Sequence, residues 1–184
     1  SMPYKPGQIA AVGLLGRVPN VLLVSPKSGI NTVAQLLERA KRQPGKLNYA
    51  SNGNGTSLHL SAELLKSSTG TFITHIPYRG VAPATMDMLA GHVQLVTGTI
   101  PALLPFIKAG KLRCIATGTA QRLPQLPDVP TVAEQGYPGF EMTQWYGLLA
   151  PATLAQAQVD KLAVAAAKAI HMPESMARLQ ADAA

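Results

Sequence analysis

Short apolar segments alternate with helix-like segments between residues 21 and 117, and this alternation restricts the fold more than any other feature of the sequence. Strands are expected at 21–24, 46–51, 72–78, 92–96 and 112–117. Apolar residues at helical spacing predict helices at 30–42, 56–67, 82–90 and 102–109. This pattern is typical of an α/β layer fold with a mostly parallel sheet.

The pattern changes in segment 120–143, which is rich in proline and glycine and is expected to be a long loop with one short helix near Thr131 to Gln135. Beyond it, Trp145 to Leu149 is strand-like. Residues 153–170 and 173–182 are expected to form two further helices.

The net charge of +7 raises the question of a nucleic-acid or membrane partner. The sixteen Lys and Arg residues are scattered, and no basic block is interleaved with aromatic residues, so binding to nucleic acid is not favoured. No apolar run reaches the 18 residues of a membrane span. The single cysteine, Cys114, lies among apolar residues and is interpreted as a small buried side chain rather than a nucleophile.

The stretch YASNGNGTSLHL at 49–60 carries the clearest candidate site. Gly53 and Gly55 allow positive φ and close approach of a ligand, and a helix is expected to begin at Thr56. Free amides at a helix N-terminus attract anions, and Ser51, Asn52 and Thr56 add neutral donors. The stretch lacks the lysine of a phosphate-binding loop and the third glycine of a dinucleotide fingerprint. The local pattern leaves two readings equally open, a carboxylate cradle and an ordinary loop with Thr56 as N-cap.

A second strand-to-helix turn occurs in HIPYRGVAPA at 75–84, where Tyr78, Arg79 and Gly80 follow a strand. Ligands of open α/β sheets bind beyond the carboxyl ends of the strands, so both turns are expected at one edge of the sheet. Arg79 has two readings, a partner for a carboxylate or an ordinary solvated arginine.

No catalytic or metal site is expected from the sequence. There is no G-x-S-x-G elbow, the acidic residues Glu63, Asp87, Asp128 and Glu134 are far apart, and no two histidines have metal-ligand spacing. His59, one turn into its helix, is interpreted as a structural residue bonded to a neighbouring loop. No cofactor is expected.

Several runs together resemble one known family. They are KLNYASNGNGTSLHLSAELL, HIPYRGVAPATMDMLAGHVQLV, AGKLRCIATG, RLPQLPDVPTVAEQGYPGFE and WYGLLAPA. In this order they resemble the substrate-binding proteins of tripartite tricarboxylate transporters, the Bug or TctC-like family of bacterial periplasmic receptors. The resemblance covers about residues 17 to 180.

The resemblance implies a fold like that of type II periplasmic binding proteins, with two α/β lobes joined by crossing strands. It also implies a non-catalytic receptor that closes around a small organic carboxylate, held mainly by main-chain amides, hydroxyls and water. The ligand-binding residues carried over to this chain are Ser51, Asn52, Gly53, Gly55, Thr56, Tyr78, Arg79, Gly80 and Thr97. Thr97 stands where an aromatic residue is usual and Gly98 where Asp is frequent, and both differences are expected to alter the pocket wall.

The resemblance further implies that residues 20–143 form one complete lobe, with 1–19 and 144–184 as fragments of the other. The strands near Val21–Val24 and Trp145–Leu149 would cross between the lobes. Part of the first lobe would then lie outside this chain, together with a signal peptide directing the native protein to the periplasm. The uncovered apolar surface is expected to favour self-association.

Three hypotheses follow for the function. The leading one is a periplasmic receptor that delivers a di- or tricarboxylate, an aromatic acid or an amino acid to the membrane permease of the transporter. The alternative is the ligand-binding effector domain of a transcription regulator, which the upstream gene sequence would reveal by a DNA-binding head instead of a signal peptide. An enzyme on an α/β scaffold is the weakest, because no nucleophile–base or metal set is present.

Overall fold

The computed structural model describes residues 4–181 as a mixed α/β structure. In chain order its elements are η1 (Pro6–Gln8), β1 (Ile9–Val24), η2 (Pro26–Ser28), α1 (Val33–Arg42), β2 (Asn48–Ser51), α2 (Ser57–Thr69), β3 (Thr74–Pro77), α3 (Val81–Ala90), β4 (Leu95–Thr99), α4 (Ile100–Lys108), β5 (Arg113–Thr117), β6 (Thr143–Pro151), α5 (Gln156–Ile170) and α6 (Pro173–Ala181). Two compact units divide the chain, one of residues Pro19–Thr143 and one made of the segments on either side.

The sheet of the Pro19–Thr143 unit has the strand order β3-β2-β4-β1-β5. Strand β2 runs parallel to β3 and β4, whereas β1 runs antiparallel to β4 and β5. Four strands therefore share one direction and β1 alone opposes them, which refines the expectation of a mostly parallel sheet. The opposing strand brings its residue Asn20 opposite Thr99, at the edge where the other strands end.

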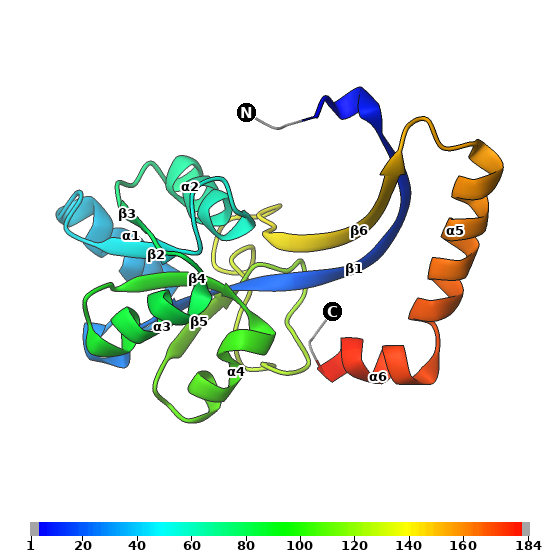
Figure 1. Ribbon diagram of the computed structural model, residues 1–184. Helices are drawn as coiled ribbons and strands as arrows, with labels where there is room; N and C mark the ends of the chain where they lie inside the picture. The colour runs from blue at the N-terminus through cyan, green and yellow to red at the C-terminus, as the bar shows by residue number, and fades with distance from the viewer. Residues whose placement is uncertain (1–3, 182–184) are drawn as a thin grey trace. The chain divides into compact units, whose positions relative to one another are not determined.

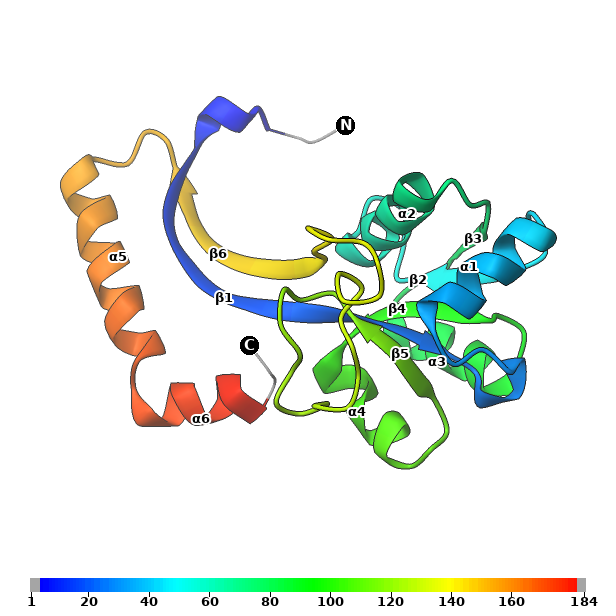
Figure 2. The same ribbon diagram turned by 180° about the vertical axis from the view of Figure 1, so that it is seen from behind.

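Helices cover both faces of this sheet. In Figures 1 and 2, α2 lies on one side of the strands and α3 and α4 lie on the other. The connections explain this arrangement, because the chain moves one way along the sheet from β2 through α2 to β3 and returns the other way through α3 to β4. Right-handed crossovers in opposite directions place their helices on opposite faces.

The helix ends follow the expected local chemistry. The Thr32 hydroxyl accepts a bond from the Gln35 amide at the start of α1, and the Thr56 hydroxyl accepts one from the His59 amide at the start of α2. Gly70 ends α2 in the left-handed conformation, with φ of 62°. The core of the unit is apolar, and its largest fully buried side chains include Tyr49, Leu22, Leu36, Leu65 and Met88.

Two expectations about local structure need correction. The strand expected at 21–24 is the inner end of β1, which spans 16 residues. The helix expected near Thr131 to Gln135 is a set of hydrogen-bonded turns. Thr131 and Glu134 exchange the bonds of a capping box, so a helix-like start is present, but Gly136 with φ of 104° and Pro138 follow at once and prevent a second turn.

The other unit contains the outer part of β1, most of β6, and the helices α5 and α6. Its strands carry several exposed apolar side chains, among them Leu14, Trp145, Tyr146 and Leu149. Within the described part of the chain, no helix combines the length and the apolar character needed to cross a membrane.

Candidate functional site

The loop from Ser51 to Thr56 joins β2 to α2 and is held by its own side chains. The buried Ser51 hydroxyl accepts a bond from the Gly53 amide, at 3.2 Å between Oγ and N. The Thr56 hydroxyl donates to the Gly53 carbonyl oxygen at 2.8 Å. Gly53 and Gly55 have φ of 131° and 76°, values that other residues rarely adopt. The loop is therefore a fixed turn that places the N-terminus of α2 at the carboxyl edge of the sheet.

The turn Tyr78–Gly80 lies directly beside this loop. Strands β2 and β3 are parallel neighbours, and the Tyr78 amide donates to the Ser51 carbonyl oxygen at 3.0 Å. A Cβ atom on Gly53 would lie 3.9 Å from the Tyr78 carbonyl oxygen, so the two main chains nearly touch. The two glycine-containing turns that the sequence placed at one edge are thus adjacent.

The three residues of this second turn differ in their contacts. The Tyr78 hydroxyl donates to the Asp87 carboxylate at 2.6 Å, and burial together with this contact raises the pKa of Tyr78 to about 12. Arg79 is exposed and has no hydrogen-bond or ion-pair partner among residues 4–181. Gly80 is the N-cap of α3 and provides no side-chain cap, so the Val81 and Ala82 amides receive no cap from it, and the next position is Pro83, which has no amide proton.

Thr97 and Gly98 lie on strand β4 and not in either of the two turns. Thr97 on β4 is fully buried, and its hydroxyl donates to the Leu58 carbonyl oxygen of α2 at 2.7 Å. Gly98 faces the opposite side, where a Cβ atom would lie 2.0 Å from Leu103 Cδ1 of α4. Leu103 therefore occupies the space that a side chain at position 98 would need. Thr97 contacts the helix that carries the loop, and not the loop itself.

Sequence reasoning missed a stack of rings behind the loop. The ring centroids of Tyr49 and His75 are 4.7 Å apart, and those of His75 and His59 are 4.3 Å apart. His75 bonds the Ser51 hydroxyl at 2.7 Å, and His59 Nδ1 accepts from the Gly55 amide at 3.2 Å. The signal was the register of two parallel strands, which places Tyr49 opposite His75. The structural role expected for His59 agrees with this contact.

The stack continues into a charged pair on α2. Both the Tyr49 hydroxyl and the Lys66 ammonium donate to Glu63 Oε1 at 2.6 Å. Partial burial alone would raise the pKa of Glu63, but these two hydrogen bonds outweigh it and lower the pKa. Burial and the same carboxylate raise the pKa of Tyr49 above its ordinary range. The cluster fixes β2, β3 and α2 to one another just behind the loop.

The protein is expected to lose stability as His75 becomes protonated. Partial burial and then the nearby His59 and Lys66 lower the pKa of His75, while Glu63 opposes them. The folded state thus resists a proton that the unfolded state accepts near pH 6.5. Stability is fully present above that value and is lost as the pH falls through it. Urea unfolding between about pH 7.5 and about pH 5.5 should show this loss, and His75→Gln should reduce it.

The matched control for this prediction is His171→Gln at the C-cap of α5, because His171 is exposed. Equal pH dependence of the unfolding free energy in the parent chain and in His75→Gln would contradict the prediction.

Ser51 and His75 are the residue types of a catalytic nucleophile and its base, but their surroundings are not those of a catalytic pair. Ser51 is 1% exposed, and among residues 4–181 His75 has no hydrogen bond to a carboxylate that would orient it. Cys114 is half-buried where a buried residue was expected, and desolvation of its thiol raises the pKa to about 12, so it is held in its unreactive form. Among residues 4–181, no three His, Cys, Asp or Glu residues are grouped so that they could bind a metal ion.

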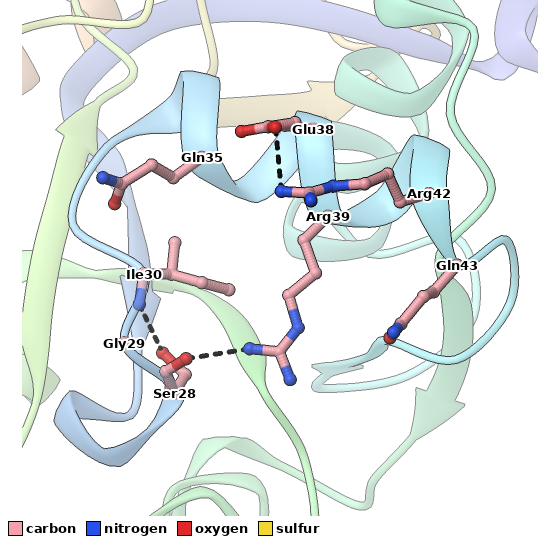
Figure 3. Close-up of a pocket in the computed structure, with 8 residues that line it drawn as sticks. All are labelled: Ser28, Gly29, Ile30, Gln35, Glu38, Arg39, Arg42 and Gln43. Carbon is pink, nitrogen blue, oxygen red and sulfur yellow. Dashed lines mark hydrogen bonds and ion pairs between the residues drawn. The ribbon is translucent and has the colours of Figure 1, made fainter.

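A pocket of about 500 Å³ with two arginines is lined by residues of η2, α1 and the segments that adjoin them. Figure 3 shows that its two guanidinium groups are already engaged. Arg39 donates to the Ser28 carbonyl oxygen, and Arg42 pairs with Glu38, both at 2.8 Å. Segment 26–28 follows Val24, which pairs with the first residue of β4, so the pocket lies away from the carboxyl edge. We call it the rival pocket, because it is the other place where an anion could bind. Its two arginines are engaged, so they offer less positive charge to a ligand than the types of lining residues suggest.

Comparison with protein families gives one match over almost the whole chain. Residues 1–183 match the family model described as the tripartite tricarboxylate transporter family receptor, TctC. Among curated proteins, a relative from Pseudomonas sp. (strain P51), described as a UPF0065 protein in the tcbD-tcbE intergenic region, is 37% identical over 97% of this chain and 54% of its own length. The chain therefore spans about half the length of this curated relative.

Solved structures give the same picture. Rpa4515 of R. palustris with adipate is 35% identical, has a TM-score of 0.87, and is matched over 99% of this chain and 62% of that protein. The periplasmic binding protein BugD is 31% identical, has a TM-score of 0.84, and is matched over 97% and 60%. The fold of this chain is thus that of part of a periplasmic binding protein.

Proposed function

Because the chain belongs to the tripartite tricarboxylate transporter receptor family, TctC, we propose that it forms the carboxylate-binding part of a periplasmic solute receptor. The ligand carboxylate would lie at the carboxyl edge of the sheet, between the Ser51–Thr56 loop and the Tyr78–Gly80 turn. The observation that carries the proposal is the adjacency of these two turns, each of which opens a helix.

The chemistry of this edge suits a small anion. The helices α2 and α3 both begin here, and the positive ends of their dipoles and their first amides favour negative charge. The main chain at Gly53, Gly55 and Gly80 has no side chain to hinder a close approach. Arg79 adds one uncommitted positive charge. This set favours a carboxylate held by amides over one held by a buried ion pair.

Each predicted residue has a distinct role under this proposal. Gly53, Gly55 and Gly80 let the main chain approach a ligand closely, with the Gly53 and Gly55 amides already donating to Ser51 Oγ and His59 Nδ1, and Thr56 caps α2. Ser51 shapes the loop from below. Asn52 offers a polar side chain whose Oδ1 is buried and lacks a hydrogen-bond partner among residues 4–181. The Tyr78 hydroxyl is committed to Asp87, so Tyr78 contributes its main chain and its ring. Thr97 supports the site from behind.

The proposed partners follow from the family. The ligand is a small organic acid, and adipate is the most direct probe because the solved relative Rpa4515 carries it. In the periplasm, the receptor would deliver the bound acid to the membrane permease of a tripartite tricarboxylate transporter. The proposal requires no catalysis and no cofactor.

A thermal-shift screen tests the ligand class. Adipate, citrate, benzoate and glutamate are each added to the chain, with the uncharged diamide of adipic acid as the control. Binding to the native state raises Tm, so at least one acid should raise Tm while the diamide should not. No shift with any acid, or an equal shift with the diamide, would contradict the carboxylate proposal.

We also propose that the isolated chain self-associates through the β1–β6 region of the smaller unit. Trp145, Tyr146 and Leu149 expose half or more of their surface on β6, and Leu14 does so on β1. Exposed apolar side chains of this size on a pair of strands are a candidate interaction surface. Light scattering should show a concentration-dependent dimer that Trp145→Lys weakens and that Val164→Lys on α5 leaves unchanged. A monomer at every concentration would exclude it.

A further inference from the structure

Two buried polar contacts join the strands of the sheet to the first turn of α2. From β4, the Thr97 hydroxyl donates to the Leu58 carbonyl oxygen at 2.7 Å. From α2 itself, the Ser61 hydroxyl donates to the Ser57 carbonyl oxygen at 2.7 Å and is held by the Asn20 side chain of β1. Both carbonyl groups belong to the turn that would bind the anion.

The direction of the Asn20 contact follows from the protons available. Ser61 has one hydroxyl proton and gives it to Ser57, so it can only accept from its other neighbour. Asn20 therefore presents its amide nitrogen, and Nδ2 lies 3.0 Å from Ser61 Oγ. Asn20 is fully buried, and its Oδ1 has no partner among residues 4–181. Leaving a buried acceptor unpaired costs free energy. Asn20 therefore keeps its bond to Ser61 although its own Oδ1 stays unpaired.

These two carbonyl groups are chemically linked to the amides at the helix start. The Ser57 carbonyl shares its peptide group with the Leu58 amide, and the Leu58 carbonyl shares its group with the His59 amide. A hydrogen bond donated to the carbonyl end of a peptide group polarises its N–H end and makes it a stronger donor. The same contacts also prevent the first turn from rotating away from the sheet.

We propose that Thr97, and Ser61 held by Asn20, are positioning residues that fix and polarise the first-turn peptide groups of α2 for binding a carboxylate. The inference rests on the proposed function. None of the three side chains touches the ligand. Ser61 and Asn20 act through the Leu58 amide, whereas Thr97 acts through the His59 amide, which donates to the Thr56 hydroxyl and so holds the loop beside the site. The three contacts explain why polar residues are buried between an apolar sheet and an apolar helix face.

The test compares Thr97→Val with Thr97→Ser. Valine keeps the shape of threonine but cannot donate, whereas serine keeps the hydroxyl. Adipate affinity, measured by titration of ¹H–¹⁵N amide spectra, should weaken about three- to tenfold in Thr97→Val, the effect of one net hydrogen bond, and should recover in Thr97→Ser. Without ligand, the His59 amide proton should move upfield in Thr97→Val only. Ser61→Ala should move the Leu58 amide proton in the same way.

The control is Thr71→Val, which removes the hydroxyl of a buried threonine beyond the far end of α2 and should change neither readout. The spectra also report whether each variant is folded. If the unsubstituted chain binds neither adipate nor any other acid of the thermal-shift screen, the proposed function fails and the inference with it; if another acid binds, that acid replaces adipate in this test. If the unsubstituted chain binds and Thr97→Val binds equally well, the inference alone is overturned. An unmoved His59 amide proton in folded Thr97→Val would also overturn it.

Discussion

Replacing Gly118 with alanine is expected to reduce the free energy of unfolding by about 3 kcal/mol, at the upper end of typical overpacking costs. Gly118 follows β5 and lies against Met142, and the two residues and Asn20 exchange three main-chain hydrogen bonds of 2.8–3.1 Å. A Cβ atom would lie 2.0 Å from Met142 Cγ and 2.8 Å from the Met142 carbonyl oxygen. A rotamer change can move the side chain but not the carbonyl, so the main chain itself must shift.

Urea denaturation followed by circular dichroism measures this effect. Gly13→Ala is the matched control, because Gly13 lies in β1, has no positive φ, as is true of Gly118, and would find no atom within 4 Å of its new Cβ. It should change stability by less than about 0.5 kcal/mol. Equal stability of the two variants would mean that β5 and segment 140–142 are not packed as described.

Replacing Gly55 with valine is expected to weaken adipate binding by about tenfold or more, since strain of this kind is worth roughly 1–3 kcal/mol. Gly55 has φ of 76°, which a β-branched residue resists. The new Cβ meets no atom within 4 Å, so the effect would come from the backbone and not from a clash. The loop would have to change conformation, and the amides between Gly53 and the start of α2 would leave their positions.

Calorimetric titration of Gly55→Val and Gly55→Asn with adipate separates the loop conformation from side-chain bulk. Asparagine is one of the few residues that accept the left-handed conformation. The adipate affinity of Gly55→Asn should therefore stay within about threefold of the parent value, which is less than the effect of losing one ordinary hydrogen bond. An unchanged affinity in Gly55→Val would remove this loop from the binding site.

The sequence was sufficient for the layer fold because its signals are local. Apolar spacing located the helices α1 to α5 to within a few residues, and Thr56 was expected at the start of α2. The direction of β1 was not predictable, because an apolar strand has the same pattern whichever way it runs. The turns at Thr131–Gln135 were misread as a helix for a similar reason, since the local start signal is present and only the following Gly136 prevents its continuation.

The candidate site was predictable only in part. The glycines at 53 and 55 and the position after a strand indicated the edge of the sheet. The contacts behind the loop depend on pairing between distant segments. His75 meets His59 because β2 and β3 are in register, and Thr97 reaches Leu58 because α2 crosses β4. Such pairs have no signature in a single sequence, and the burial of Thr97 is the reason that we propose a supporting role for it instead of ligand contact.

The most direct test of the proposed site is an amide-resolved titration of the 184-residue chain with adipate. The proposal predicts saturable shifts of the Gly53, Gly55 and Leu58 amides, with little change at Arg39 and Gln43 in the rival pocket, and no response to the diamide. Shifts confined to the Arg39 pocket, or no shift at the N-terminus of α2 at any adipate concentration, would contradict a carboxylate site at the carboxyl edge of the sheet.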